Sequence, residues 1–431
     1  MINANLSVNA KGHLTIGGVD TVDIASEYGT PAYVIDENAV RARVSEFRES
    51  LNQYYGGNSM CLYASKALSC MEIYRILASE GIGVDVVSGG EIYTAYKAGF
   101  PMNRVYFHGN NKTLDELTLA LDTGVGRFVV DNITELETLS ELCVRKGMTA
   151  DILFRIKPGI DAHTHSFVRT GQIDSKFGFA LETGEAFDAV KAAVAAKNIN
   201  LVGVHCHIAS QVFETNPFVE AAEVMLGFIG EVKRELSYEI DELDLGGGFG
   251  VPYTDRDARV SYQDFMKPVS ERIHAICAEQ GLKLPKILIE PGRSIIAESG
   301  ITLYTVGAVK NIPNIRTYVS VDGGMTDNPR YILYGSEYTI ECANKANLSK
   351  DTVVTIAGKC CESGDLIQEN APLQQVEVGD ILAVLTTGAY NYSMSSNYNR
   401  IPRPPVVMVK DSSCRLAVRR ETWDDVVRLD S

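Results

Sequence analysis

Short apolar runs recur along the first two thirds of the chain, and stretches of helical length separate most of them. The eight runs are Cys61-Leu62-Tyr63, Val84-Asp85-Val86-Val87, Val105-Tyr106-Phe107, Phe128-Val129-Val130, Ile152-Leu153-Phe154, Leu201-Val202-Gly203-Val204, Leu243-Asp244-Leu245 and Ile287-Leu288-Ile289. Before the first run, Val40, Val44, Phe47 and Leu51 repeat with the period of an amphipathic helix. About eight successive βα units are typical of a TIM-type (β/α)8 barrel. We therefore expect an α/β fold with such a barrel over residues 34–302.

The pattern changes after about residue 300, where β-rich runs follow one another without long helical stretches between them. These runs are Leu303 to Val309, Tyr318 to Val321, Val353 to Ile356, Ile381 to Leu385, Val406 to Val409 and Arg415 to Arg419. They predict a mostly antiparallel β domain. Near the N-terminus, Leu14-Thr15-Ile16 and the two glycines after it indicate a strand and a turn. We expect residues 1–33 to join residues 303–431 in this second domain.

Composition and charge narrow the classes of partner. The 431 residues are 45% hydrophobic and 22% charged, as in globular proteins. The 40 Lys and Arg against 55 Asp and Glu give a formal net charge of −15, which disfavours binding to nucleic acid. No apolar run approaches the roughly 20 residues of a membrane span, and residues 1–20 lack the pattern of a signal peptide. Because the nine cysteines also lack paired metal spacing, we expect a cytoplasmic protein with reduced thiols and no membrane partner.

Each predicted barrel strand ends in polar residues or glycines. This matters because the active sites of such barrels lie at the carboxyl ends of the strands. In chain order these residues are Lys66, Asp85 with Ser88-Gly89-Gly90-Glu91, His108-Gly109-Asn110-Asn111, Asp131-Asn132, Arg155, His205 and His207, Gly246-Gly247-Gly248, and Glu290-Pro291-Gly292-Arg293. One charged residue in such a place is usually a solvated loop residue, but polar groups at every strand predict a functional site.

Three of these features suit one cofactor. The triglycine that starts at Gly246 lets backbone N–H groups approach an anion such as a phosphate. Lys66 can form a Schiff base with a carbonyl if burial lowers its pKa. Glu290 and Arg293, joined by a rigid Pro-Gly, offer a carboxylate to a pyridinium nitrogen and a guanidinium to an anion. Together they predict a site for pyridoxal 5'-phosphate and no metal site.

The same residues belong to longer motifs that extend from about Pro31 to Arg403. The motifs are Tyr63-Ala-Ser-Lys-Ala67, Asp85-Val-Val-Ser-Gly-Gly-Glu91, His108-Gly-Asn-Asn-Lys112, Ala162-His-Thr-His165, Thr170-Gly-Gln172 with Ser175-Lys-Phe-Gly178, His205-Cys-His207, Gly246-Gly-Gly248, Glu290-Pro-Gly-Arg293, Cys361-Glu-Ser-Gly-Asp365 and Gly388-Ala-Tyr390. With these motifs the chain resembles the barrel-type, alanine racemase-like family of pyridoxal phosphate decarboxylases, and within it the members that act on diaminopimelate. Glu290 argues against a racemase, which typically has an arginine near the ring nitrogen.

The resemblance implies a role for each site residue. Lys66 would form the Schiff base with the cofactor, and His207 would stack on its pyridine ring. Cys361, chosen over Cys360 on motif register alone, would supply a proton to the product, which a thiol can do at neutral pH. The implied cofactor-binding residues are Lys66, Asp85, Arg155, His207, Ser210, Gly246, Gly247, Gly248, Glu290, Gly292, Arg293 and Tyr390. The implied substrate-binding residues are Arg293, Arg330, Tyr334, Glu362 and Tyr390.

The residues expected to bind the part of the substrate remote from the reacting carbon indicate which substrate it is. Arg293 and Arg330 offer cations to a remote carboxylate and Glu362 offers an anion to a remote ammonium, which matches the second amino-acid group of diaminopimelate. The expected reaction is meso-2,6-diaminopimelate to L-lysine and CO2, the last step of bacterial lysine synthesis. The resemblance also implies a homodimer with shared active sites, in which Cys361 comes from the neighbouring subunit. Decarboxylation of ornithine, lysine or carboxynorspermidine is the alternative within this class.

Two alternatives belong to other classes. A metal-dependent amidohydrolase also uses a barrel with His-x-His pairs, and this chain has two, at His163/His165 and His205/His207. The sequence lacks a convincing further set of His and Asp ligands for that chemistry. A binding protein that kept the fold without catalysis would have lost the lysine or the cysteine named above, and the chain has both.

Three positions depart from the family pattern near the predicted site. Ala209 replaces a glycine in the usual His-Ile-Gly-Ser-Gln, and Lys359 replaces the proline before the cysteine motif. Lys157 replaces the asparagine of the usual Arg-x-Asn-Pro. The two lysines either add positive charge there or, as is more usual for lysine, lie on a solvated face, and none of the three changes removes a predicted catalytic group.

Overall fold

The computed structural model describes residues 3–160 and 175–431, so the motifs at 162–165 and 170–172 lie outside the described residues. The chain divides into two compact units. The barrel unit comprises Val44–Gly250 and Val260–Ser294, and the β unit comprises Met1–Arg43, Val251–Arg259 and Ile295–Ser431. The domain boundaries expected from the sequence stay a prediction. Within the described ranges, no helix is long and apolar enough to cross a membrane.

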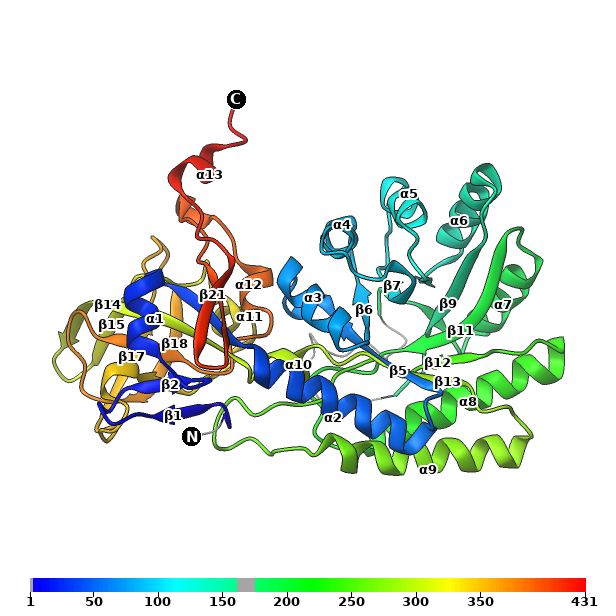
Figure 1. The fold of residues 1–431 in the computed structure, drawn as a ribbon. Helices are drawn as coiled ribbons and strands as arrows, with labels where there is room; N and C mark the ends of the chain where they lie inside the picture. Colours follow the sequence, from blue (N-terminus) through cyan, green and yellow to red (C-terminus); the bar gives the residue numbers. More distant parts are fainter. Residues whose placement is uncertain (1–2, 161–174) are drawn as a thin grey trace. The chain divides into compact units, whose positions relative to one another are not determined.

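Eight parallel strands of the described barrel unit form a closed sheet (Figure 1). They are β5 (Ser59–Ala64), β6 (Gly83–Val86), β7 (Val105–Phe107), β8 (Arg127–Val130), β9 (Ala150–Lys157), β11 (Ile199–Cys206), β12 (Glu242–Asp244) and β13 (Lys286–Ile289). The pairings of β13 with β5 and of β8 with β9 close the ring, and the two-residue β10 (Phe179–Ala180) extends β9. Every apolar run predicted for the barrel overlaps one of these strands, so the predicted TIM-type barrel is confirmed.

Helices flank the barrel strands, and the first of them precedes β5 while the others follow barrel strands. They are α2 (Glu37–Tyr55), α3 (Met71–Ser79), α4 (Gly89–Lys97), α5 (Leu114–Thr123), α6 (Ile133–Lys146), α7 (Glu185–Ala195), α8 (Asn216–Leu236) and α9 (Tyr262–Gln280). The predicted apolar stripe lies on α2, and its four side chains are buried. Within the barrel unit, Phe47 stacks on Tyr262 with 4.3 Å between ring centroids. Burial of each such side chain stabilises the fold by about 1.5–3 kcal/mol.

Some polar residues at the strand ends cap the helices that follow. Ser88, Thr113 and Asn132 each accept a hydrogen bond from the backbone N–H three residues later, at 3.2, 3.2 and 2.9 Å. Such caps stabilise a helix by about 1 kcal/mol. Ser88 and Asn132, which the sequence placed among the polar groups of the site, therefore have a structural role.

The β unit contains a mixed sheet with strand order β18-β17-β15-β14-β4-β20-β21. Its strands are β4 (Ala32–Asp36), β14 (Gly300–Ile312), β15 (Arg316–Val321), β16 (Ile340–Cys342), β17 (Thr352–Ala357), β18 (Leu366–Leu373), β19 (Ile381–Val384), β20 (Val406–Lys410) and β21 (Ser413–Val418). β19 pairs with both β14 and β16. Most pairings are antiparallel, as predicted, but β15 with β17 and β20 with β4 are parallel.

The N-terminal strands belong to this unit as well. β1 (Leu6–Val8), β2 (Leu14–Ile16) and β3 (Val19–Asp20) form a small antiparallel sheet, and α1 (Thr21–Tyr28) follows it. Ile16 packs in one apolar cluster with Leu303 and Val407, and all three are fully buried. The remaining helices of the unit are short: α11 (Arg330–Tyr334), α12 (Asn391–Met394) and α13 (Trp423–Val427), while α10 (Arg293–Ile296) starts at the end of the barrel unit.

Candidate active site

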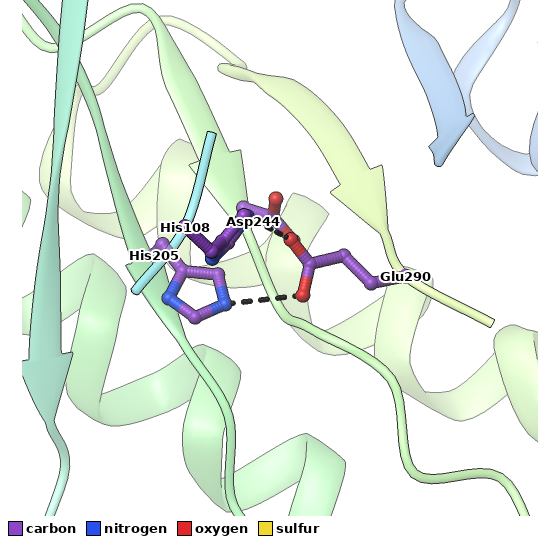
Figure 2. Close-up of side chains that lie close together, drawn as sticks. All are labelled: His108, His205, Asp244 and Glu290. Carbon is purple, nitrogen blue, oxygen red and sulfur yellow. Dashed lines mark hydrogen bonds and ion pairs between the residues drawn. The ribbon is translucent and has the colours of Figure 1, made fainter. Parts of the chain in front are cut away.

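Glu290 lies in a buried polar cluster at the carboxyl ends of the barrel strands. It directly follows β13, and only 6% of its surface is exposed. Its Oε1 lies 2.7 Å from Nε2 of His108, which follows β7, and its Oε2 lies 3.2 Å from Nε2 of His205 on β11 (Figure 2). Both imidazoles are buried, and their rings meet edge to face at 4.8 Å. Each oxygen of the Glu290 carboxylate therefore contacts one imidazole nitrogen.

The electrostatics of the cluster keep Glu290 ionised. Burial alone would raise its pKa, but the charge interactions and hydrogen bonds of His108 and His205 outweigh burial and hold the pKa of Glu290 well below its usual range. Burial lowers the pKa of His108 to about 4, although Glu290 opposes this shift, and burial also lowers the pKa of His205. Nε2 of His205 is hydrogen-bonded to Oε2 of Glu290, whereas Nε2 of His108 contacts Oε1 without the geometry of a hydrogen bond.

Lys66 follows β5 in a short 3-10 turn, Ser65–Ala67. Its two neighbours in the turn are buried, and the Ser65 hydroxyl donates to Glu91 Oε2 at 2.6 Å. The Lys66 side chain itself is exposed, so it lacks the burial that the sequence analysis required. The charge of Lys66 lowers the pKa of Asp85, against the larger effect of burial, and it also lowers the pKa of His207.

Asp85 and His207 lie around this lysine. Asp85 is the third residue of β6 and is buried, and its Oδ1 has no hydrogen-bond partner among the described residues. Burial first, and then the charge of Glu290, raise the pKa of Asp85 well above its usual value. Burial first, and then the charges of Lys66 and Arg155, lower the pKa of His207 well below its usual value. His207 is therefore a neutral ring.

The triglycine after β12 makes approaches that no larger residue allows. A Cβ on Gly247 would lie 2.0 Å from the Glu290 carbonyl oxygen, and a Cβ on Gly248 would lie 2.1 Å from the Ala209 carbonyl oxygen. Gly248 also has a φ of +108°, and the Gly247 N–H donates to His207 Nδ1 at 3.3 Å. The loop therefore packs its backbone directly against the neighbouring strand ends. Ala209 is fully buried, so the fold accommodates its additional methyl group.

Four more predicted cofactor-binding residues lie in this part of the barrel unit. Arg293 donates from Nη2 to the Ser210 hydroxyl at 3.0 Å. Gly292 lies against the last residue of β5, because its Cβ would be 2.8 Å from the Cβ of Ala64. Arg155, on β9, is 4.0 Å from Asp131 and lies over the ring of Phe177 at 4.3 Å. The barrel unit thus brings its predicted cofactor-binding residues to one end of the sheet.

A second group of predicted residues lies within the β unit. Arg330 begins α11 and is buried, and its guanidinium lies 5.1 Å from the ring centres of both Tyr334 and Tyr390. It also donates from Nη2 to the Ser336 hydroxyl at 3.5 Å. The two rings orient the guanidinium through cation–π contacts. Arg330, Tyr334 and Tyr390, which were predicted to bind substrate, therefore lie together in the β unit.

Cys361 and Glu362 lie in an exposed loop of the β unit. The buried carboxylate of Asp365 organises this loop, because it accepts the N–H of Cys360 at 2.7 Å and of Met325 at 2.6 Å. Cys360 is buried, which raises the pKa of its thiol to about 11, whereas Cys361 is exposed. This difference favours Cys361 over Cys360 as a proton donor. Lys359 is exposed as well.

Sequence reasoning missed the partners of Glu290. It noted His108 and His205 at strand ends without assigning them to Glu290, and it treated Asp244 as part of an apolar strand. An acidic residue between two leucines in a buried strand was the available signal, because such a residue needs a partner.

The comparisons with known proteins agree with this site. The family model described as pyridoxal-dependent decarboxylase, pyridoxal binding domain, matches residues 37–297. The diaminopimelate decarboxylase of Halalkalibacterium halodurans is 48% identical, over 98% of this chain and 96% of its own, and that of Bacillus subtilis is 46% identical with the same coverage. The crystal structure of diaminopimelate decarboxylase from M. jannaschii in complex with L-lysine is similar to this chain, with a TM-score of 0.91 at 34% identity over 100% of this chain and 98% of its own.

These matches extend over both units of the chain and support the decarboxylase interpretation instead of the amidohydrolase and the binding protein. They also establish the cofactor, because the matching family is pyridoxal-dependent. The chain therefore belongs to the pyridoxal-dependent decarboxylases, a family of carboxy-lyases, and within it to the diaminopimelate decarboxylases.

Proposed function

We propose that this chain decarboxylates meso-2,6-diaminopimelate to L-lysine and CO2, with pyridoxal phosphate held at the carboxyl ends of the barrel strands. The observation that carries the proposal is the buried Glu290 carboxylate, which His108 and His205 keep ionised. A permanently anionic group in this place suits a protonated pyridine nitrogen. The L-lysine bound to the M. jannaschii relative agrees with the proposed product.

The residues of the barrel unit fit the cofactor. Gly247 and Gly248 pack so closely on the carbonyl oxygens of Glu290 and Ala209 that no side chain fits there, and this glycine loop would offer backbone N–H groups to the phosphate. The Ser210 hydroxyl, held by Arg293, offers a further polar contact for the phosphate. Lys66 offers the amine to which the cofactor is attached.

The chain's own groups divide the chemistry between them. Bound pyridoxal phosphate supplies a conjugated sink for the electrons that remain on Cα when CO2 leaves. Glu290 would hold a proton on the ring nitrogen and so deepen this sink, and the neutral His207 would lie beside the cofactor without adding a competing charge. Cys361, an exposed thiol, donates the proton that replaces the carboxylate on Cα.

Contacts with the amino-acid group that does not react would make the enzyme specific for diaminopimelate over ornithine. Arg330, oriented by Tyr334 and Tyr390, binds the carboxylate that is kept, with Arg293 as its second cation. Glu362 binds the remote ammonium. A substrate such as ornithine lacks that carboxylate and would leave the cation of Arg330 without its partner, which costs binding energy.

A parallel assay of two substrates tests this proposal. We expect the wild-type enzyme to release lysine from meso-diaminopimelate and to act far less efficiently on ornithine. Arg330→Ala should lower kcat/KM for diaminopimelate by about 10- to 150-fold, since a hydrogen bond to a charged group contributes roughly 1.5–3 kcal/mol. Arg316→Ala is the matched control, because Arg316 pairs with Glu369 on the surface and should leave kcat/KM unchanged. Equal efficiency on both substrates would contradict the proposed specificity.

We also propose a cytoplasmic homodimer with shared active sites, on the strength of the family resemblance. Each site would combine Lys66 of one subunit with Cys361 of the other. Lys66→Ala and Cys361→Ala chains, each inactive alone, should then regain activity when mixed, because one site of every mixed dimer has both groups. Random exchange makes about half of the dimers mixed, so recovery should approach about a quarter of the wild-type rate. No recovery after demonstrated subunit exchange would show that both groups act within one chain.

A further inference from the structure

Asp244 is a buried acid that the proposed chemistry does not use. It ends β12, is fully buried, and accepts the Gly246 N–H through Oδ1 at 2.8 Å. The pairing of β11 with β12 sets His205 directly beside it. In the part of the chain that the structure describes, Oδ2 of Asp244 has no hydrogen-bond partner. Figure 2 shows its carboxyl group next to Glu290, and polar atoms of these residues and of His108 lie within 4.8 Å of one another.

Two carboxyl groups this close in a buried site cannot both be ionised. Both oxygens of Glu290 lie within 3.2 Å of an imidazole nitrogen, whereas Asp244 accepts one backbone N–H. The shared negative charge is therefore more stable on Glu290, and the proton is more stable on Asp244. Burial first, and then the charge of Glu290, accordingly raise the pKa of Asp244 well above its usual value.

The other titratable groups around the pair do not reverse this assignment. Asp85 is a further acid whose charge would oppose ionisation of Asp244. Burial raises the pKa of the Cys61 and Cys206 thiols, which are therefore neutral. The cations Lys66 and Arg155 act on Asp85. Neither of these cations forms an ion pair with Asp244 among the interactions described for the chain.

We propose that Asp244 is a positioning residue. Its carboxyl group stays protonated, and its acid O–H donates a hydrogen bond to Glu290. With the two imidazoles it completes a set of three polar groups around one carboxylate. This set fixes the direction of the anion before the cofactor arrives. The inference rests on the proposed pairing of Glu290 with the ring nitrogen of the cofactor.

The alternative occupant of this cluster is a metal ion, and the spacing disfavours it. Zinc binds nitrogen and oxygen ligands at about 2.0–2.2 Å, so two ligands of one ion lie at most about 4.4 Å apart. The four candidate atoms lie within 4.8 Å of one another, but His108 Nε2 is 2.7 Å from Glu290, closer than the roughly 3.3 Å between two ligands of a tetrahedral zinc ion. Hydrogen-bonded protons fit this arrangement better than an ion does.

Two substitutions with side chains of similar branched shape distinguish the effect of the hydrogen-bond donor at position 244 from the effect of packing. Asp244→Asn keeps an acceptor for the Gly246 N–H and replaces the acid O–H donor with an amide N–H. Asp244→Leu removes both. If Asp244 is a neutral donor, Asp244→Asn should bind pyridoxal phosphate within about threefold of wild type, whereas Asp244→Leu should bind it at least about tenfold more weakly.

The infrared spectrum of the cofactor-free enzyme tests the protonation directly and requires no activity. We expect the wild-type spectrum to contain the carbonyl band of a buried protonated carboxylic acid, and the Asp244→Asn spectrum to lack that contribution. An unchanged band would overturn the inference, and so would Asp244→Asn binding the cofactor as weakly as Asp244→Leu. One equivalent of zinc in the purified enzyme would assign the cluster to a metal instead.

These outcomes are separable from the proposed function. If Asp244→Leu does not fold, the infrared difference and the affinity of Asp244→Asn still decide the inference. If the wild-type enzyme does not act on diaminopimelate, the proposed function fails, while the band still reports whether Asp244 carries the proton. If the band is absent but lysine is released, only the inference fails.

Discussion

Lys66→Ala should abolish decarboxylation while the chain still folds. The variant loses the only proposed amine for attachment of the cofactor, and no neighbouring group supplies another at the end of β5. Little packing is lost, because the Lys66 side chain is exposed and the buried neighbours Ser65 and Ala67 are kept. Release of CO2 from diaminopimelate measures the first effect, and urea unfolding measures the second. We expect no turnover above background and a free energy of unfolding within about 0.5 kcal/mol of wild type.

The attachment site can be found without relying on activity. Reduction of the wild-type enzyme with borohydride, followed by peptide mapping, should place the pyridoxyl label on Lys66. Lys157→Ala and Lys359→Ala are the matched controls, because each removes a lysine that departs from the family pattern and should keep both label and activity. A label on either of those two lysines would contradict the assignment.

The barrel could be predicted because its strands are buried on both faces. Parallel strands covered by helices are continuous apolar runs, and each of the eight runs overlaps a strand. β16 and β18 of the other unit gave no such signal. β16 has three residues, and β18 reads Leu-Ile-Gln-Glu-Asn-Ala-Pro-Leu, in which polar residues and a proline interrupt the apolar pattern. Their pairing with neighbouring strands, not their own composition, makes them strands.

The site could be predicted only as far as strand ends are visible in the sequence. Glu290 and Lys66 come directly after apolar runs, so the rule for barrel active sites finds them. The sequence does not show that Asp244 and His205 are neighbours, because only the register of β11 with β12 sets them side by side. The link from Glu290 to His108 needs the closed ring of strands, because these residues are 182 positions apart, from 290 − 108. Spacing along the chain contains no such information.

Glu290→Gln should slow decarboxylation strongly without unfolding the protein. Glutamine keeps the shape but removes the negative charge that holds a proton on the ring nitrogen. Its amide nitrogen would also face an imidazole N–H donor, so one histidine must change tautomer. His205 can do so, because its Nδ1 has no hydrogen-bond partner among residues that the structure describes. Loss of one preorganised electrostatic group of this kind typically lowers kcat by about 10²- to 10³-fold.

Steady-state kcat, measured with saturating pyridoxal phosphate, is the test of this charge. Glu135→Gln is the matched control, because it removes another buried carboxylate of the barrel unit, one that lies in the first turn of α6 and pairs with Lys112 at 2.7 Å. That change leaves the Lys112 ammonium buried without its anion, so it should cost stability, by roughly 3–5 kcal/mol, while changing kcat by less than about fivefold. If Glu290→Gln kept kcat within fivefold of wild type, or if Glu135→Gln lowered kcat equally, the special role of the Glu290 charge would have to be abandoned. A large loss of kcat confined to Glu290→Gln would tie the rate to this one ionised carboxylate, because both variants lose a buried acid but only one loses the anion that faces the cofactor.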